Sequence, residues 1–113
     1  MDERQALLSF GALSQETRLR ILRMLVVAGP EGLAAGLIAE QAGVTASNVS
    51  FHVKELERAG LVSSRRESRS ILYTAEFDAL NGLLRFLMED CCAGRICLPD
   101  AMADDCGSAL KTN

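Results

Sequence analysis

The stretch "LIAEQAGVTASNVSFHVKELERAGLV", residues 37–62, contains the pattern of two short helices separated by a turn. Apolar residues recur in its second half at i, i+4 and i+7, the spacing of one buried helical face: Val49, Val53 and Leu56. Thr45 is placed to cap this second helix, Gly60 to end it, and Gly43 is typical of a left-handed end to the helix before it. Two helices this close together have the spacing of a helix-turn-helix.

The sequence before this stretch predicts two further helices. Residues 3–13 place four apolar residues at helical spacing: Ala6, Leu7, Phe10 and Leu13. We expect Ser14 to cap a second helix and Gly29-Pro30 to end it, with one apolar stripe made of Leu19, Leu22, Leu25 and Val26. In the helix that follows, which ends at Gly43, we expect three residues to point inward: Leu37, Ile38 and Ala42.

After the quoted stretch the hydrophobic period changes. "LVSSRR" and "RSILYT" read as two short strands joined at Glu67 and Ser68, a tip without glycine that forces Ser68 into an unfavourable turn geometry. A last helix is predicted from about Glu76 to the cysteines, with one stripe of Phe77, Leu80, Leu84, Leu87 and Cys91. Four helices, a hairpin and a closing helix make a mainly α fold with a β-hairpin wing (α+β), a winged helix-turn-helix. We expect residues 1–98 to form this DNA-binding and dimerisation domain and residues 99–113 to form a flexible tail.

Composition is compatible with one soluble domain. The chain has 113 residues, of which 49% are hydrophobic and 24% are charged. The N-terminus shows no long apolar stretch, so we expect neither a signal peptide nor a membrane partner, and a cytoplasmic protein. The net charge of −3 argues against nucleic acid, but residues 44–74 carry five basic against three acidic side chains, a local charge of +2. Such a local basic surface can bind phosphate.

The predicted second helix of the helix-turn-helix presents polar groups away from its apolar face. We expect six residues there to contact DNA: Ser47, Asn48, Ser50, Phe51, His52 and Lys54. Hydroxyls and the amide can hydrogen-bond to base edges or phosphates, and Phe51 can contact a thymine methyl. His52, the single histidine, is interpreted as a DNA contact rather than a metal ligand. The alternative is an ordinary solvated helix face.

Three arginines lie at the predicted hairpin tip: Arg65, Arg66 and Arg69. Their position beside the predicted DNA-reading helix favours contacts with the DNA backbone or the minor groove. The alternative is that these charges only protect an edge hairpin from aggregation.

Three of the four cysteines fall in "EDCCAGRIC", residues 89–97, and in a reducing compartment such a cluster favours metal binding or redox chemistry. The sulfurs of Cys91, Cys92 and Cys97 can meet at little entropic cost, because few residues separate them. Three thiolates satisfy pyramidal trivalent arsenic or antimony, whereas zinc prefers four ligands. Cys106 could supply a fourth thiolate for zinc or cadmium. A thiol-oxidation switch and a purely structural role as small buried hydrophobes also stay open.

Three segments together resemble the ArsR/SmtB family of metal-responsive repressors, over about residues 5–90: "LSQETRLRILRML", the quoted stretch and "SSRRESRSILYTA". The resemblance implies a winged-helix homodimer that occupies operator double-stranded DNA and leaves it when a metal or metalloid binds. Many arsenic-sensing members carry Cys-Val-Cys where this chain has "GLAAGLIAE", and zinc-sensing members use Asp and His pairs on the last helix, which here has no histidine. The C-terminal cysteines are similar to those of a subset whose arsenite site lies there.

These observations together predict a homodimeric repressor that releases operator DNA when arsenite, or antimonite, binds Cys91, Cys92 and Cys97. The first and last helices are expected to form the dimer interface. One alternative is the same repressor responding to zinc, cadmium or oxidation, and another is a protein-interaction module without DNA. A thiol oxidoreductase is disfavoured because adjacent cysteines form a disulfide only with strain. We therefore expect no enzyme and no catalytic cofactor.

Overall fold

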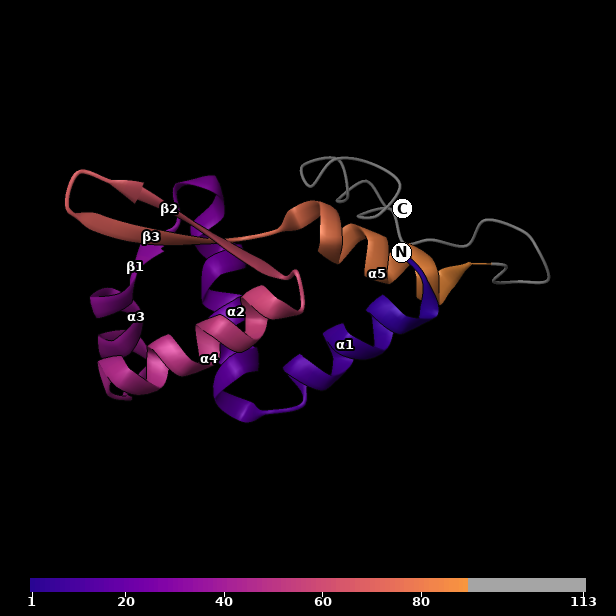
Figure 1. The fold of residues 1–113 in the computed structure, drawn as a ribbon, viewed down its shortest axis with the longest axis horizontal. Coiled ribbons are helices and arrows are strands. Elements are labelled where there is room, and N and C mark those ends of the chain that lie inside the picture. The colour runs from indigo at the N-terminus through magenta and orange to yellow at the C-terminus, as the bar shows by residue number, and fades with distance from the viewer. Residues whose placement is uncertain (90–113) are drawn as a thin grey trace, which may run out of the picture.

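The computed structural model describes residues 1–89, and over this range the predicted order of four helices, a hairpin and a closing helix is confirmed (Figure 1). The elements run in chain order as α1 (Glu3–Leu13), α2 (Glu16–Ala28), the 3-10 turn η1 (Gly29–Glu31), β1 (Leu33–Ala34), α3 (Ala35–Ala42), α4 (Ala46–Arg58), β2 (Val62–Glu67), β3 (Ser70–Ala75) and α5 (Phe77–Met88). The predicted fold class, mainly α with a β-hairpin wing, is therefore correct.

The core forms where α4 packs against α2 and α3. The predicted inward face of α4 is confirmed, since Val49, Val53 and Leu56 are all buried. These side chains belong to one cluster with residues of the other elements, among them Ile21, Leu25, Ile38 and Leu61. Each fully buried aliphatic side chain stabilises the fold by about 1.5–3 kcal/mol, so this cluster fixes the orientation of α4 within the domain.

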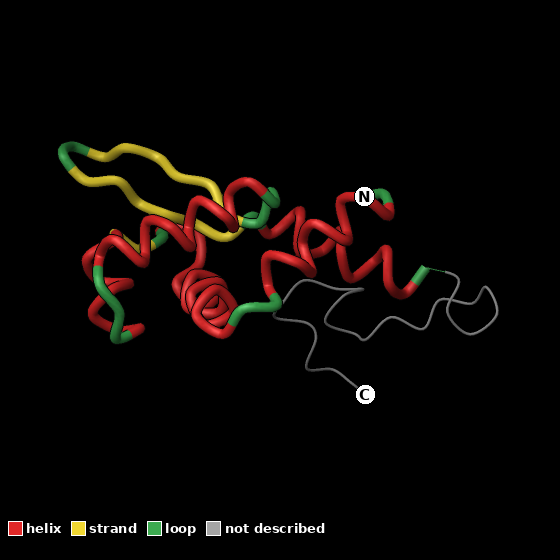
Figure 2. Tube along the Cα trace, turned by 60° about the horizontal axis from the view of Figure 1, so that its bottom comes forward, coloured by secondary structure: helices red, strands yellow, loops and turns green. Residues whose placement is uncertain are grey.

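The sheet has one strand that the sequence did not predict. Its order is β1-β3-β2, with both pairs antiparallel, and Leu33 of β1 lies opposite Tyr73 of β3. A strand of two residues is too short to show an alternating pattern, which is why β1 could not be predicted. In Figures 1 and 2 the β2–β3 hairpin extends beyond the helices at the end of the molecule that holds α3, while α1 and α5 lie toward the opposite end.

The hairpin turn lies one residue later than predicted. Glu67 pairs with Ser70, so β2 includes Glu67 and the two loop residues are Ser68 and Arg69. Ser68 has φ +56°, in the left-handed region, which confirms the unfavourable geometry expected at a tip without glycine.

The ends of the helices confirm two predicted caps and correct a third. Thr45 Oγ1 accepts a hydrogen bond from the Asn48 N–H at 3.2 Å, and Gly43 ends α3 with φ +74°. The prediction that Ser14 caps α2 is wrong. Its hydroxyl donates to the Gly11 carbonyl at 2.8 Å and so closes α1, while the side chain of Gln15 accepts from the N–H at the start of α2.

Several predicted apolar stripes are rotated relative to the buried faces. Small residues of α1 are buried (Ala6, Ser9 and Ala12), because only they allow α1 to lie close to its neighbours. Leu83 is the buried residue of α5. Eight of the residues predicted to lie on buried faces are instead exposed on the single chain: Leu7, Phe10, Leu19, Val26, Leu37, Phe77, Leu84 and Leu87.

Candidate nucleic-acid interface

Helices α3 and α4, joined by a turn that contains Gly43 and Thr45, form the helix-turn-helix, and its outer surface is the first part of the site. The buried face of α4 directs five of the predicted contact residues to the surface, where all are exposed: Ser47, Asn48, Ser50, Phe51 and Lys54. Phe51 is 55% exposed. A large aromatic side chain exposed on a helix among hydroxyl, amide and ammonium groups is suited to reading a DNA groove.

His52 is the one predicted contact on α4 that is partly buried. Its Nδ1 accepts a hydrogen bond from Nε of Arg18 on α2 at 3.2 Å. The same guanidinium lies over the Phe51 ring, 5.7 Å from its centroid, and the rings of Phe51 and His52 meet edge to face at 5.3 Å. Arg18 therefore joins α2 to two neighbouring residues of α4.

The chemical state of His52 follows from this contact. Burial, and then the positive charge of Arg18, lower the pKa of His52 below its ordinary value of 6.5. The imidazole is neutral at pH 7, and because Nδ1 accepts a hydrogen bond, the ring proton is on Nε2. The ring thus offers an N–H donor on the side away from Arg18. Sequence reasoning missed Arg18, since a contact between residues 34 positions apart leaves no local signal.

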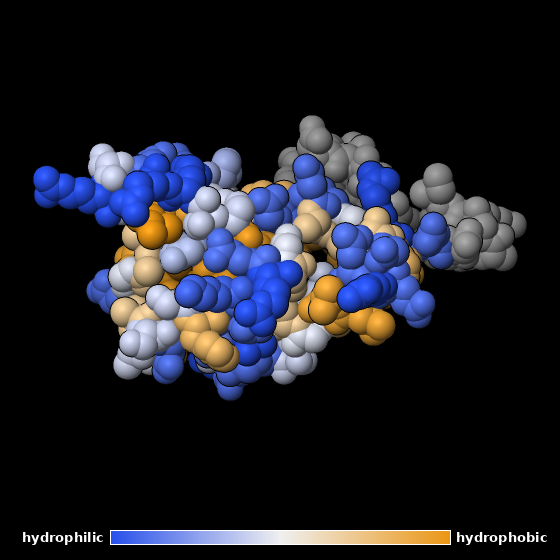
Figure 3. All heavy atoms as spheres, in the orientation of Figure 1, coloured by the Kyte–Doolittle hydropathy of each residue, from blue (hydrophilic) through white to orange (hydrophobic). Residues whose placement is uncertain are grey.

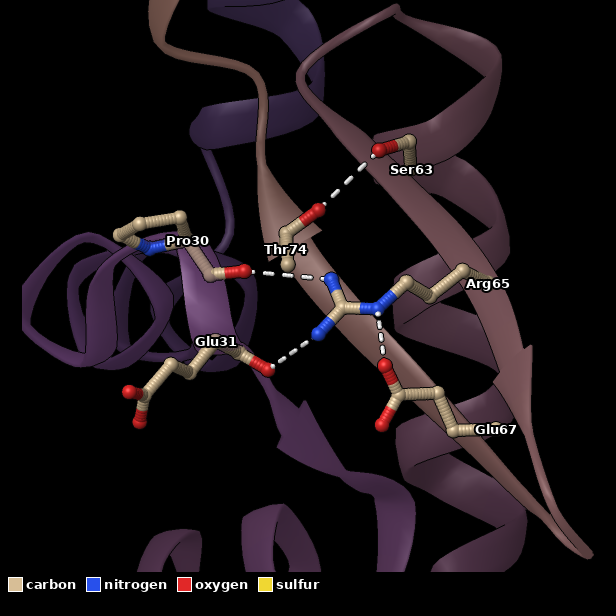
Figure 4. A network of polar contacts seen from close by, with 6 residues as sticks. All are labelled: Pro30, Glu31, Ser63, Arg65, Glu67 and Thr74. Carbon is tan, nitrogen blue, oxygen red and sulfur yellow. Dashed lines mark hydrogen bonds and ion pairs between the residues drawn. The ribbon is translucent and has the colours of Figure 1, made fainter.

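The wing provides the second part of the site. Arg66 and Arg69 are exposed, and within residues 1–89 the structure gives neither of them an ion pair. Arg65 is different, because its guanidinium faces the domain. It donates to the carbonyls of Pro30 and Glu31 and to the carboxylate of Glu67 (Figure 4). All three arginines are thus exposed, and within residues 1–89 they differ in that Arg65 has hydrogen-bond partners whereas Arg66 and Arg69 have none.

Comparison with known proteins identifies this arrangement. A helix-turn-helix domain model matches residues 13–65. The chain is 36% identical to YceK, an uncharacterized HTH-type transcriptional regulator of Bacillus subtilis, over 71% of this chain and 79% of the relative. It superimposes on an ArsR-like transcriptional regulator from a Rhodococcus species with a TM-score of 0.68 and 32% identity, covering 76% of this chain and 78% of the other. The chain belongs to the ArsR/SmtB family.

A second solved structure that resembles this chain is a homodimer. It is the winged helix-turn-helix DNA-binding domain of a possible ArsR-family regulator from Mycobacterium bovis. The TM-score is 0.62 at 26% identity, covering 80% of this chain and 89% of that one. The ArsR/SmtB-family protein described here is thus a DNA-binding transcriptional regulator, and α4 and the wing are the elements through which its fold presents polar and basic groups.

The predicted metal ligands of this regulator, Cys91, Cys92 and Cys97, lie outside the described residues, as does Cys106. Within residues 1–89 no group of three or more His, Cys, Asp or Glu side chains is arranged to hold a metal ion. No helix in this range is both long and apolar enough to cross a membrane.

Proposed function

We propose that this regulator is a homodimeric repressor that binds operator double-stranded DNA through α4 and the wing and leaves it when trivalent arsenic binds Cys91, Cys92 and Cys97. The observation that carries the DNA-binding part is the exposed polar face of α4 beside a wing with two outward arginines. Ser47 and Asn48 supply short hydrogen-bonding groups for base edges, while Arg66 and Arg69 supply charge for phosphates.

Exposed apolar residues support the dimer. On α1, Leu7 is 65% exposed and Leu8 54%, and on α5, Leu84 is 42% exposed and Leu87 54%. The two helices contact each other, and Figure 3 shows apolar side chains gathered over this part of the surface. Exposed apolar residues gathered in this way are typical of an interface. A second copy of the chain is the partner we propose, because the Mycobacterium bovis domain is a homodimer.

The effector part of the proposal rests on the sequence that follows α5. That helix ends at Met88, three residues before Cys91, so the proposed arsenic ligands follow closely in sequence after a helix of the proposed dimer interface. Binding arsenic there would change how α5 meets its partner and hence the separation of the two α4 helices. Two-fold DNA-binding proteins of this kind need half-sites about 34–36 Å apart, so a small change is sufficient to spoil the fit. A coupling of about 1–3 kcal/mol, roughly 5- to 150-fold in DNA affinity, is the usual scale.

The deciding experiment measures operator binding by wild type, Cys97→Ser and Cys106→Ser, each with and without arsenite. Cys97→Ser should bind the operator as wild type does and fail to release it, and Cys106→Ser should respond nearly as wild type. Release from the operator by a Cys91, Cys92 and Cys97 triple serine variant would refute the arsenic site. Competition between arsenite and zinc or cadmium for the thiols separates arsenic from a divalent effector, and a disulfide that forms with release would support oxidation instead.

A further inference from the structure

Each nitrogen of the Arg65 guanidinium donates one hydrogen bond within the chain. Nη1 donates to the Pro30 carbonyl at 3.1 Å, Nη2 donates to the Glu31 carbonyl at 3.0 Å, and Nε donates to the Glu67 carboxylate at 3.1 Å. The two carbonyls belong to η1, which is 34 and 35 residues away in sequence. Figure 4 shows the guanidinium between the wing and η1, with Glu67 on the remaining side. We call these contacts the Arg65 clamp.

The alternation of strand residues explains why neighbouring arginines differ. Successive side chains of β2 point to opposite faces of the sheet, so Arg65 shares a face with Ser63 and Glu67, and Arg66 is on the other. Ser63 contacts Thr74 of β3 through their hydroxyls at 3.1 Å, and Glu67 neutralises the Arg65 charge. The Arg65 side chain is still 42% exposed, but every nitrogen of its guanidinium already has an acceptor in the chain, and a phosphate would have to compete with these contacts. Arg66, whose side chain has no such partner within the described residues, keeps its full charge for one.

The clamp also joins β2 of the wing to η1, which is far from it in sequence. Its acceptors lie in η1, which directly follows α2, and β1 and α3 come next in the chain. Arg65 lies beyond the part of the hairpin that packs in the core, because Val62 is buried and the residues from Ser64 to the tip are exposed. At this level β3 also pairs with β1, since Leu72 lies opposite both Arg65 and Ala34. The clamp thus lies directly before the outer part of the hairpin, in which β2 and β3 pair only with each other. A two-stranded hairpin alone is marginally stable.

We propose that Arg65 is a positioning residue, which holds the wing at a fixed angle to the helix-turn-helix, and that it does not contact DNA. This inference rests on the proposed binding of DNA through α4 and the wing. It assigns phosphate contact to Arg66 and Arg69 and gives Arg65 a different task, although the three are close in sequence.

The test compares Arg65→Ala, Arg65→Lys and the matched control Arg66→Ala in operator binding at a series of salt concentrations. Arg66→Ala should lower the slope of log affinity against log salt by about 0.9, the value for one phosphate contact. Arg65→Ala should keep the wild-type slope and weaken binding roughly three- to tenfold, because the wing then spends less time in the binding position. Arg65→Lys should lose nearly as much, since one ammonium cannot span two carbonyls as the guanidinium fork does.

A measurement on the free protein makes the test independent of DNA. The Gly32 amide donates to the Gly29 carbonyl at 3.2 Å, within the turn that the clamp holds. Its hydrogen exchange should be faster in Arg65→Ala and unchanged in Arg66→Ala. Unchanged exchange in Arg65→Ala, a salt slope lowered as in Arg66→Ala, or full rescue by lysine would each overturn the proposal. If Asn48→Ala and Arg66→Ala leave operator binding intact, the proposed DNA interface fails instead, while the exchange result still decides whether the clamp exists.

Discussion

Gly32, immediately before β1, allows a prediction about stability whose size can be compared with that at a second glycine, Gly43. It has φ +77°, and a Cβ at this position would lie 2.5 Å from the Tyr73 carbonyl oxygen and 2.7 Å from Cγ2 of Thr74. Gly43 has φ +74°, and an added Cβ there would meet nothing within 4 Å. The backbone of Gly32 also differs, because its ψ of −176° lies with positive φ in a region that is essentially restricted to glycine, whereas Gly43 has ψ 31° and lies in the left-handed helical region. Gly32→Ala therefore meets a larger backbone penalty than Gly43→Ala and, in addition, a clash.

The expected losses in the free energy of unfolding follow from these distances and backbone angles. A left-handed backbone costs an alanine about 1–2 kcal/mol, and the stiffer unfolded chain returns about 0.4–1 kcal/mol, which leaves Gly43→Ala destabilised by about 1 kcal/mol. In Gly32→Ala the neighbouring atom is a backbone oxygen of β3, which cannot rotate away, so β1 must shift. Overpacking of this kind adds about 1–3 kcal/mol. We expect Gly32→Ala to lose about 2–4 kcal/mol in total, a large part of the stability of a small domain.

Urea denaturation of the two variants and wild type, at one protein concentration, measures the difference directly. The free energy of unfolding of Gly32→Ala should lie at least about 1 kcal/mol below that of Gly43→Ala, with similar dependence on urea. Equal losses would show that β1 is not held closely against β3, and the reasoning from the 2.5 Å approach would be wrong.

Three further predictions concern stability, pH and assembly. Thr45→Ala removes the cap that accepts from the Asn48 N–H, and thermal unfolding should show a loss of about 1 kcal/mol. The pKa of His52 is lowered from 6.5 in the folded state, so the fold favours the neutral imidazole. Its contribution to the free energy of unfolding should be complete above pH 6.5 and lost as the pH falls through the folded pKa. His52→Gln should abolish this pH dependence in melting experiments. Sedimentation should find Leu87→Asp monomeric and the matched control Val27→Asp dimeric, although Val27 is the more exposed of the two apolar residues at 86% against 54%.

The helix-turn-helix could be predicted because its signals are local. The spacing of Val49, Val53 and Leu56 specifies one buried face of α4, and the caps at Gly43 and Thr45 act within one turn of their own positions. Each of these signals comes from residues at most seven positions apart, so a short window of sequence contains the whole cause. The same holds for the strained Ser68, which follows from a two-residue turn without glycine.

Features that depend on distant residues could not be predicted. The contacts of Arg18 with His52 and of Arg65 with η1 join residues 34 or 35 positions apart, and an arginine that makes such a contact resembles any surface arginine in sequence. The faces of α1 and α5 were misjudged for a related reason. Periodicity identifies an apolar stripe, but it does not say whether the stripe meets the same chain or another molecule.

The two long-range arginine contacts have a shared consequence for regulation. Arg18 joins α2 to the polar face of α4, and Arg65 joins the wing to η1, which continues from the end of α2. Both elements of the proposed DNA interface are thus tied to α2, which also contacts α1, and α1 contacts α5. An effector that acts at the C-terminal end of α5 then meets a unit in which α4 and the wing are fixed relative to each other. In the proposed dimer such a unit would move as a whole, so arsenic binding would change the separation of the two copies of α4 rather than the shape of either one.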